Sequence, residues 1–188
     1  MSRGAPPAEA LGILREAGAI LQGHFELTSG RHSDTYLEKF RVLQFPQYTE
    51  HLCRLIAARF QGQHVDLVAG PTTGGIILAY EVGRQLGVRG IFAEGDGQRT
   101  FRRGFRIGPG ERVLVVDDIL TTGGSVREVL SAVREAGGQP VGVAVLVDRT
   151  GGGADFGLPF HACLTLDIDA YEASDCPLCA QGVPLTKT

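Results

Sequence analysis

The chain has 188 residues, of which 43% are hydrophobic, and a formal net charge of −3 with a pI near 5.9. A chain of this length and apolar content can bury one sizeable core, so residues 1–188 are expected to form a single domain. The mildly acidic balance gives no electrostatic reason to expect nucleic acid or an anionic membrane surface as a partner.

Targeting and membrane signals are not evident in the sequence. Residues 1–10 have no apolar signal segment, and no run reaches the roughly eighteen apolar residues of a spanning helix. We therefore expect a cytoplasmic protein without membrane contact. In that compartment its four cysteines are expected to be reduced thiols.

The first forty residues differ in pattern from the rest of the chain. A short helix is expected at 8–16, followed by two strand-like pieces. We expect residues 1–40 to form a small N-terminal lid over the carboxyl edge of a sheet built by the remaining residues.

From residue 41 onward, strand-like apolar runs alternate with amphipathic helices. Strands are expected at 65–69, 91–93, 112–116, 141–147 and 161–166. Helices are expected to begin near Pro46, after Gly75 and near Ser125. This alternation predicts an α/β fold with a parallel twisted sheet flanked by helices.

The run VLVVDDILTTGGS at 113–125 carries the clearest chemical signal. Its apolar start predicts a strand buried on both faces, and the helix that follows has an apolar stripe. The turn between them offers N–H groups and hydroxyls at a helix N-terminus, where a phosphate is favoured. Asp117 and Asp118 only accept hydrogen bonds, so they suit ribose hydroxyls, directly or through a hydrated Mg2+. A purely structural role rarely needs two adjacent like charges.

This run resembles the phosphoribosyl-pyrophosphate (PRPP) signature of the type I phosphoribosyltransferases. Three further segments resemble those of the orotate phosphoribosyltransferases: GHFELTSGRHSDTYLE at 23–38, AGPTTGG at 69–75, and LVDRTGGG, which contains Arg149. The resemblance implies the type I phosphoribosyltransferase fold. It also implies transfer of ribose 5-phosphate from PRPP to orotate, which yields orotidine 5′-monophosphate and pyrophosphate in pyrimidine biosynthesis.

The resemblance also implies roles for individual residues. PRPP would be bound by Asp117, Asp118, Ile119, Leu120, Thr121, Thr122, Gly123, Gly124 and Ser125, and by Thr72, Thr73, Gly74 and Gly75 of a pyrophosphate loop. Orotate would be bound by Thr121, Arg149, Tyr36 and Leu37. Without the family, Arg149 would be read as a solvated loop residue, and Tyr36 and Leu37 as core of the lid. Mg2+ would arrive with PRPP, with no protein site of its own beyond Asp117 and Asp118, and the enzyme would be a homodimer that exchanges loops between sites.

Two departures from the family pattern concern its cations. Thr28 stands where the family has a Lys that contacts PRPP. The loop EGDGQRTFRRGFRIGPGE at 94–111 has four arginines but lacks the family's Lys and His residues. We expect Arg102 and Arg103 to replace them as a catalytic pyrophosphate clamp, although a guanidinium cannot act as a general acid. A solvated β-hairpin is the competing interpretation.

The C-x-x-C motif CPLC, formed by Cys176 and Cys179, is not explained by the family pattern. Such a pair can form half of a zinc site, with His161 and Cys163 as possible completing ligands. The default interpretation is a packed, reduced turn, because a redox pair needs a thioredoxin-like context.

Two alternative functions are compatible with the PRPP signature. One is a phosphoribosyltransferase for another base, since the signature contacts only the sugar and phosphates. The other is a non-catalytic regulator that senses PRPP or nucleotides while binding nucleic acid. The sequence shows no helix-turn-helix region and no basic stripe outside the arginine loop, which disfavours the regulator.

Overall fold

The structure is a computed structural model and describes residues 7–95 and 97–188. Its centre is a six-stranded sheet with the strand order β5-β4-β3-β6-β7-β8. These strands are β3 Leu67–Pro71, β4 Arg89–Glu94, β5 Thr100–Phe101, β6 Arg112–Leu120, β7 Gln139–Asp148 and β8 Phe160–Thr165. Neighbouring strands are parallel except β4 and β5, which are antiparallel. The predicted parallel α/β sheet is therefore confirmed.

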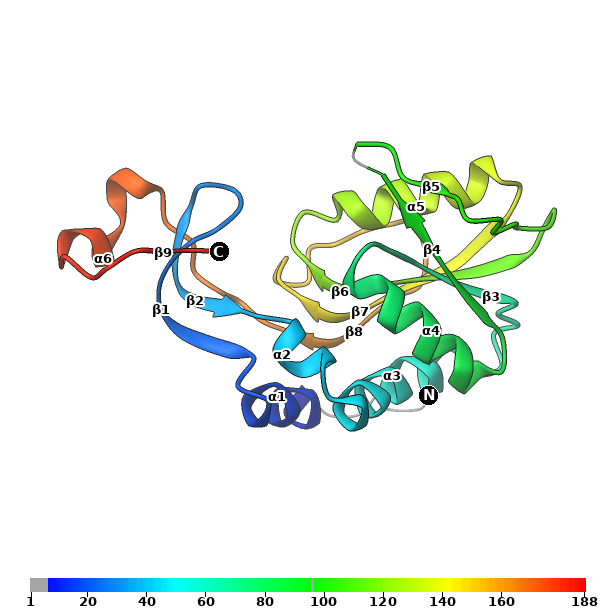
Figure 1. Ribbon diagram of the computed structural model, residues 1–188, viewed down its shortest axis with the longest axis horizontal. Helices are drawn as coiled ribbons and strands as arrows, with labels where there is room; N and C mark the ends of the chain where they lie inside the picture. Colours follow the sequence, from blue (N-terminus) through cyan, green and yellow to red (C-terminus); the bar gives the residue numbers. More distant parts are fainter. Residues whose placement is uncertain (1–6, 96) are drawn as a thin grey trace.

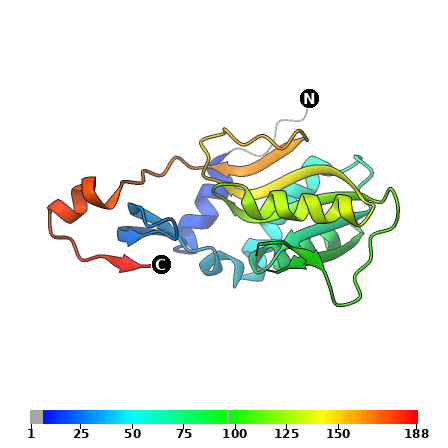
Figure 2. The same cartoon turned by 90° about the horizontal axis from the view of Figure 1, so that it is seen from above.

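Helices cover both faces of this sheet (Figures 1 and 2). The helices are α1 Pro7–Glu16, α3 Pro46–Phe60 and α4 Gly74–Leu86 on one face, and α5 Gly124–Glu135 on the other. Alternate residues of β6 serve the two faces, because Val113 and Val115 pack with α5 whereas Leu114 and Val116 pack with the other helices. This is why the run Val113–Val116 is apolar without interruption.

A second, three-stranded sheet lies at one end of the molecule (Figure 1). It contains β1 Ile20–Glu26, β2 His32–Leu37 and β9 Thr186–Lys187, in the order β2-β1-β9. The chain therefore returns at its C-terminal end to the hairpin formed by β1 and β2, which the sequence did not indicate. Of the lid expected at 1–40, residues 1–6 lie outside the described residues.

The remaining short elements are connectors. The helix α2 Phe40–Leu43 links β2 to α3, and the 3-10 turn η1 Ala173–Asp175 precedes α6 Pro177–Ala180 in the returning segment. Both sheets are joined by this chain path, and α1 packs in the same core cluster as α3 and α4.

The strand β6 is longer than the sequence indicated. The prediction ended it at residue 116, before the acidic pair, but pairing with β7 continues through Asp117 opposite Val145 to Leu120 opposite Asp148. Backbone partners on β7 thus hold two carboxylates inside a strand that their polarity alone would have ended. The boundary was wrong because inter-strand pairing outweighs local propensity.

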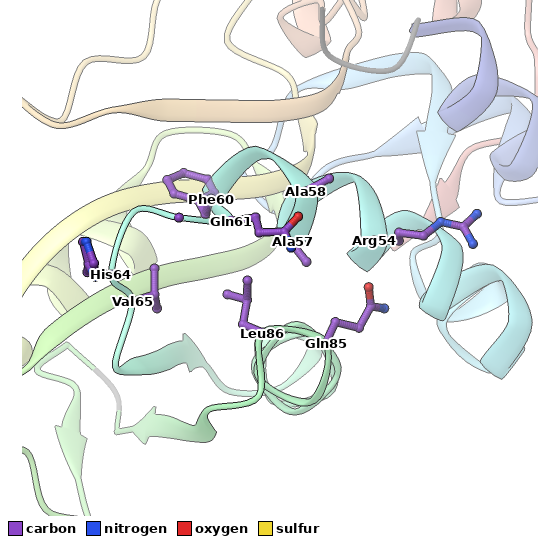
Figure 3. Close-up of a pocket in the computed structure, with 10 residues that line it drawn as sticks. Arg54, Ala57, Ala58, Phe60, Gln61, His64, Val65, Gln85 and Leu86 are labelled. Carbon is purple, nitrogen blue, oxygen red and sulfur yellow. The ribbon is translucent and has the colours of Figure 1, made fainter. Parts of the chain in front are cut away.

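Among the described residues, no helix is long and apolar enough to cross a membrane. A cavity of about 420 Å3 is lined by the C-terminal half of α3, the loop before β3 and the end of α4 (Figure 3). Because His64 and Val65 precede β3, this cavity lies toward the amino ends of the strands. Ligands of open α/β sheets bind at the opposite, carboxyl edge, so we place the functional site there.

Candidate active site

Three loops follow the neighbouring strands β3, β6 and β7 and meet at the carboxyl edge of the sheet. The loop after β3 contains Thr72 and Thr73, whose connecting peptide bond is cis. The loop after β6 begins at Thr121, and the loop after β7 begins at Arg149. Parallel neighbours bring segments from residues 72, 121 and 149 together, although they are far apart in the sequence.

The loop at 121–125 surrounds a small hollow of about 40 Å3 at the N-terminus of α5. Gly123 has φ of +80°, a conformation that favours glycine, and its carbonyl accepts from the Arg127 N–H at 3.0 Å. The N–H groups of Thr122 and Gly123 have no acceptor in the described part of the chain. Free donors at the positive end of a helix dipole suit a phosphate group.

The acidic pair is almost fully buried, with Asp117 7% and Asp118 3% exposed. The Asp118 N–H donates to Asp117 Oδ1 at 2.8 Å, and the Ile119 N–H donates to Asp118 Oδ1 at 2.6 Å. Burial, together with the neighbouring Asp118, raises the pKa of Asp117 to about 7, while Lys39 acts in the opposite direction. Apart from the ammonium of Lys39, 3.2 Å away, the buried Oδ2 of Asp118 has no donor facing it among the described residues. These groups have capacity for a ligand with hydroxyls or for a cation.

Oxygen donors of this kind match the chemistry of Mg2+, which binds few carboxylates and retains several waters. Asp117 and Asp118 are two buried carboxylates, and the one ammonium beside them, that of Lys39, balances only one of the two charges. The residues present therefore fit a hydrated Mg2+ that arrives with a phosphorylated ligand.

The loop at 70–75 approaches the acidic pair closely because it contains glycines. A Cβ placed on Gly74 would overlap the carboxylate of Asp118, and a Cβ on Gly70 would overlap the backbone of Gly75. These contacts need the absence of a side chain at Gly70 and Gly74. The structure thus brings Gly74 beside Asp118, although their roles toward PRPP stay predictions.

Lys39 is a site residue that the sequence reasoning missed. It follows β2 and places Nζ 3.2 Å from Asp118 Oδ2 and 3.4 Å from Asp118 Oδ1. Thr28, at the position of the family's Lys, is exposed beside the turn between β1 and β2. The composition could have drawn attention to Lys39, because Lys39 and Lys187 are the only lysines in the sequence of an arginine-rich chain.

Arg149 lies at the start of the loop after β7, where its N–H donates to the Leu120 carbonyl at 2.8 Å. Its Nε is buried and has no acceptor in the described part of the chain. Burial lowers the pKa of Arg149, and interaction with Tyr36 opposes this shift. A half-buried guanidinium whose buried Nε–H has no acceptor suits a planar carboxylate.

Asp148 is a second residue that the sequence reasoning missed. It is 1% exposed, and its carboxylate accepts hydrogen bonds from the Thr150 N–H and hydroxyl, both at 2.7 Å, and from the Gly152 N–H at 3.2 Å. These bonds shape the loop that carries Arg149. These bonds explain how a carboxylate can be buried at the start of this loop.

Tyr36 and Leu37 are neighbours on β2, so their side chains point to opposite faces of the strand. The Tyr36 ring packs on Phe25 with centroids 5.6 Å apart. Leu37 is buried in the core cluster that contains α1 and α3. The structure therefore places Leu37 in the core, and the orotate-binding role of Tyr36 stays a prediction.

The arginine loop forms an antiparallel hairpin in which β4 pairs with β5. Arg99 reaches the pyrophosphate loop, because its Nη1 donates to Thr72 Oγ1 at 2.9 Å. Arg102 and Arg103 are exposed and bond within the hairpin, to Thr100 Oγ1 at 3.2 Å and Glu94 Oε2 at 2.9 Å. The structure thus places Arg99 at the site of its own chain and Arg102 and Arg103 on the surface.

The expected partners of the CPLC cysteines are wrong. Cys163 lies in the core, where its thiol donates to the Leu52 carbonyl at 3.7 Å, and His161 belongs to the same strand, β8. Cys176 and Cys179 instead lie against His24 and His32. The cause is that the C-terminal segment pairs with β1 rather than packing against β8.

Comparisons with known proteins agree with this geometry. A family model described as a phosphoribosyl transferase domain matches residues 41–156. The orotate phosphoribosyltransferase of Pelotomaculum thermopropionicum is 56% identical over 180 residues, which cover 95% of each chain. That of Caldanaerobacter subterraneus is 52% identical with the same coverage.

A solved structure agrees as well. The orotate phosphoribosyltransferase of Mycobacterium tuberculosis in complex with inorganic phosphate has a TM-score of 0.70 at 28% identity, covering 85% of this chain and 95% of that chain. With half of its residues identical to such relatives over almost its full length, and with a phosphoribosyltransferase sheet and loops, the chain belongs to the orotate phosphoribosyltransferase family.

Proposed function

We propose that this chain transfers the ribose 5-phosphate of PRPP to orotate at the carboxyl edge of β3, β6 and β7, releasing pyrophosphate. The observation that carries the assignment of the base is Arg149, whose buried Nε has no acceptor in the described chain and lies one strand away from the acidic pair. A buried donor without a partner is costly, so the site is built for a ligand that accepts there.

Each part of PRPP has a matching set of groups in this proposal. The 5′-phosphate binds the free N–H groups at 121–125, and the ribose hydroxyls bind Asp117 and Asp118. The pyrophosphate binds the loop at 72–75, near the ammonium of Lys39. Orotate binds between Arg149 and Tyr36, with Thr121 on the adjoining loop.

The chain contributes position and charge rather than a covalent group. Displacement at C1 of the ribose passes through an oxocarbenium-like state, which is favoured when both reactants are held in line and water is excluded. Asp117 and Asp118 would hold a hydrated Mg2+, which supplies positive charge to the departing pyrophosphate. Lys39 and Arg99 supply further positive charge at the pyrophosphate loop.

We further propose a cytoplasmic homodimer in which Arg102 and Arg103 act at the partner's site. Both side chains are exposed, and their hairpin lies at the edge of the sheet. They are therefore available to a second copy of the chain. All four cysteines are free in the structure, which suits a reducing compartment.

A panel of bases tests the assignment. Purified protein would be incubated with PRPP, Mg2+ and each of orotate, uracil, adenine, guanine, hypoxanthine and xanthine, while base consumption is followed. We expect turnover with orotate and little with uracil, which lacks the carboxylate that Arg149 would bind. Preferential use of a purine would favour the alternative base assignment, and no turnover with any base would favour a PRPP-sensing regulator.

A further inference from the structure

Two histidines and two cysteines meet between the N-terminal hairpin and the C-terminal segment. His24 belongs to β1 and His32 to β2, whereas Cys176 precedes α6 and Cys179 lies within it. Figures 1 and 2 show these elements together at one end of the molecule, away from the six-stranded sheet. Their ligand atoms all lie within 4.8 Å of one another.

The nitrogen-to-sulfur separations of these atoms match the edges of a tetrahedron around zinc, and the nitrogen-to-nitrogen separation is somewhat shorter. His24 Nε2 is 3.0 Å from His32 Nδ1, 3.4 Å from Cys176 Sγ and 3.7 Å from Cys179 Sγ, and Cys179 Sγ is 3.3 Å from His32 Nδ1. With Zn–N near 2.0–2.1 Å and Zn–S near 2.3 Å, a tetrahedral site has ligand-to-ligand distances of about 3.3–3.8 Å. The four atoms are thus arranged for a single central ion.

Hydrogen bonds alone do not satisfy this cluster. The carbonyl of Val183 can only accept, so His24 Nδ1 carries the proton of their 2.8 Å hydrogen bond. Neutral His24 then has one lone pair, on Nε2, which faces three polar atoms at once. One lone pair cannot accept three hydrogen bonds. It can, however, bind a metal ion to which the other three atoms also bind.

The Val183 contact is also the support that metal-binding histidines usually have. A carbonyl bonded to the distal ring nitrogen fixes the tautomer and directs the other nitrogen at the metal. Here the carbonyl comes from the C-terminal segment and the histidine from β1. The same bond therefore orients the ligand and joins the two segments.

Charge and burial favour the same ion. His24, His32 and Cys176 are all buried, and two thiolates with two neutral imidazoles balance the charge of one divalent ion. A set of two nitrogens and two sulfurs in tetrahedral geometry is typical of structural zinc. All four positions are filled by protein, so the site would have no open position for substrate.

The C-terminal segment buries very few side chains of its own. Over residues 173–188, Cys176 is the only buried residue. Polar contacts do bring the segment to the hairpin, because His32 and Tyr171 exchange two backbone hydrogen bonds at 2.8 Å and the Ser33 hydroxyl donates to the Asp169 carbonyl at 2.7 Å. Small units without an apolar core commonly depend on a metal for stability.

We propose that His24, His32, Cys176 and Cys179 bind one structural Zn2+, which fastens the C-terminal segment to the β1–β2 hairpin. Tyr36 follows His32 on β2, and Lys39, which contacts Asp118, comes just after this strand. The ion would therefore also hold the lid in place over the orotate pocket. This inference is independent of the base that the enzyme uses.

Metal content of the full chain tests the proposal. Protein purified under reducing conditions is expected to hold about one zinc per chain, measured by elemental analysis. The Cys176→Ser/Cys179→Ser variant is expected to hold almost none, whereas the matched control Cys163→Ala keeps its zinc because Cys163 lies elsewhere in the core. Replacing zinc with Co2+ should produce the thiolate charge-transfer band and strong visible absorption of a tetrahedral site.

A second measurement covers the case in which the cysteine variant does not fold. Wild-type protein would be stripped with a chelator and then reloaded with Zn2+, while amide hydrogen exchange is followed. Exchange is expected to accelerate at 171–188 and 20–37 on stripping and to recover on reloading, with little change in β6 or β7. The proposal is overturned if reduced wild-type protein neither contains nor binds zinc. Zinc retained by Cys176→Ser/Cys179→Ser, or unchanged exchange on stripping, would also overturn it.

Discussion

At the residue scale, the site consists of buried polar groups whose usual partners are absent from the described chain. Arg149 Nε lacks a hydrogen-bond partner, Asp118 Oδ2 faces only the ammonium of Lys39, and Asp117 has a raised pKa because it is buried beside another carboxylate. Such groups cost stability, and active sites are where this cost is commonly found. Three substitutions test whether these residues act as described.

The first concerns Asp117 and stability. Its folded pKa lies above the ordinary value of 3.8. The folded state therefore loses stability as pH rises from about 4 to about 7, a window in which the unfolded chain has already released this proton. Asp117→Asn removes this loss and keeps an oxygen for the Asp118 N–H. Its free energy of unfolding, measured by urea titration, should exceed that of wild type by about 1 kcal/mol or more at pH 8, and by less at pH 4.

The exposed Asp34→Asn serves as the control and should show no pH-dependent gain. The contrary result would be a stability difference between Asp117→Asn and wild type that is no larger at pH 8 than at pH 4. In that case burial would not raise the pKa of Asp117. The charge argument for the acidic pair would then be lost.

The second substitution concerns orotate. Arg149→Ala removes a charge-assisted hydrogen bond worth about 1.5–3 kcal/mol, which corresponds to a loss of roughly 10–150-fold in orotate affinity. The KM for PRPP should change little, because PRPP contacts other loops. Arg149→Lys keeps the charge but loses the planar fork, so it should give an intermediate KM for orotate. An unchanged KM and kcat with orotate in Arg149→Ala would place the carboxylate contact elsewhere.

The third substitution concerns Lys39. Lys39→Met keeps much of the side-chain length but removes the ammonium that lies 3.2 Å from Asp118 Oδ2. We expect the KM for PRPP to rise about tenfold, and the effect to shrink when Asp118→Asn is already present, because contacting residues are not additive. Lys187→Met, at the other lysine, is the control. Equal kinetics in the two lysine variants would exclude Lys39 from the site.

At the element scale, strands set the positions and the loops after them supply the chemistry. Pairing of β6 with β7 through Leu120 brings the acidic pair and Arg149 to the same edge. The hairpin of β4 and β5 is different, because Arg102 and Arg103 are exposed at its far end. We proposed above that they act at the site of a second subunit.

Mixed dimers test that dependence. Arg102→Ala/Arg103→Ala should lower kcat more than it raises the KM for orotate, because these cations would act on the departing pyrophosphate. Asp117→Asn/Asp118→Asn should be inactive alone. Dimers with one chain of each kind should regain activity, since one of their two sites combines an intact acidic pair with an intact loop from the neighbour.

The exposed pair Arg54→Ala/Arg59→Ala, which lies on α3, is a control for loss of positive charge and should stay active. Full activity in Arg102→Ala/Arg103→Ala would show that the hairpin is only a solvated surface element. Mixed dimers that form but stay inactive would show that the loop does not act between subunits.

At the scale of the whole molecule, the sheet and its helices could be predicted because they follow from periodic patterns. Val113 to Val116 predicted a buried strand, and the apolar stripe after Ser125 predicted α5. The return of the C-terminal segment could not be predicted, because β9 consists of only two residues, both exposed, and so has no apolar alternation. The same holds for Lys39 and for the His24 and Cys176 contact, since single residues that meet through the tertiary fold leave no local pattern.

The balance of reactants and products tests the central claim most directly. With PRPP, Mg2+ and limiting orotate, 31P NMR would follow the phosphorus signals while absorbance follows orotate. Transfer predicts that pyrophosphate and a single new phosphomonoester form in amounts equal to the orotate consumed, and that all three stop together when orotate is exhausted. Pyrophosphate that forms without loss of orotate would contradict the account, because PRPP would then be hydrolysed rather than used for base transfer.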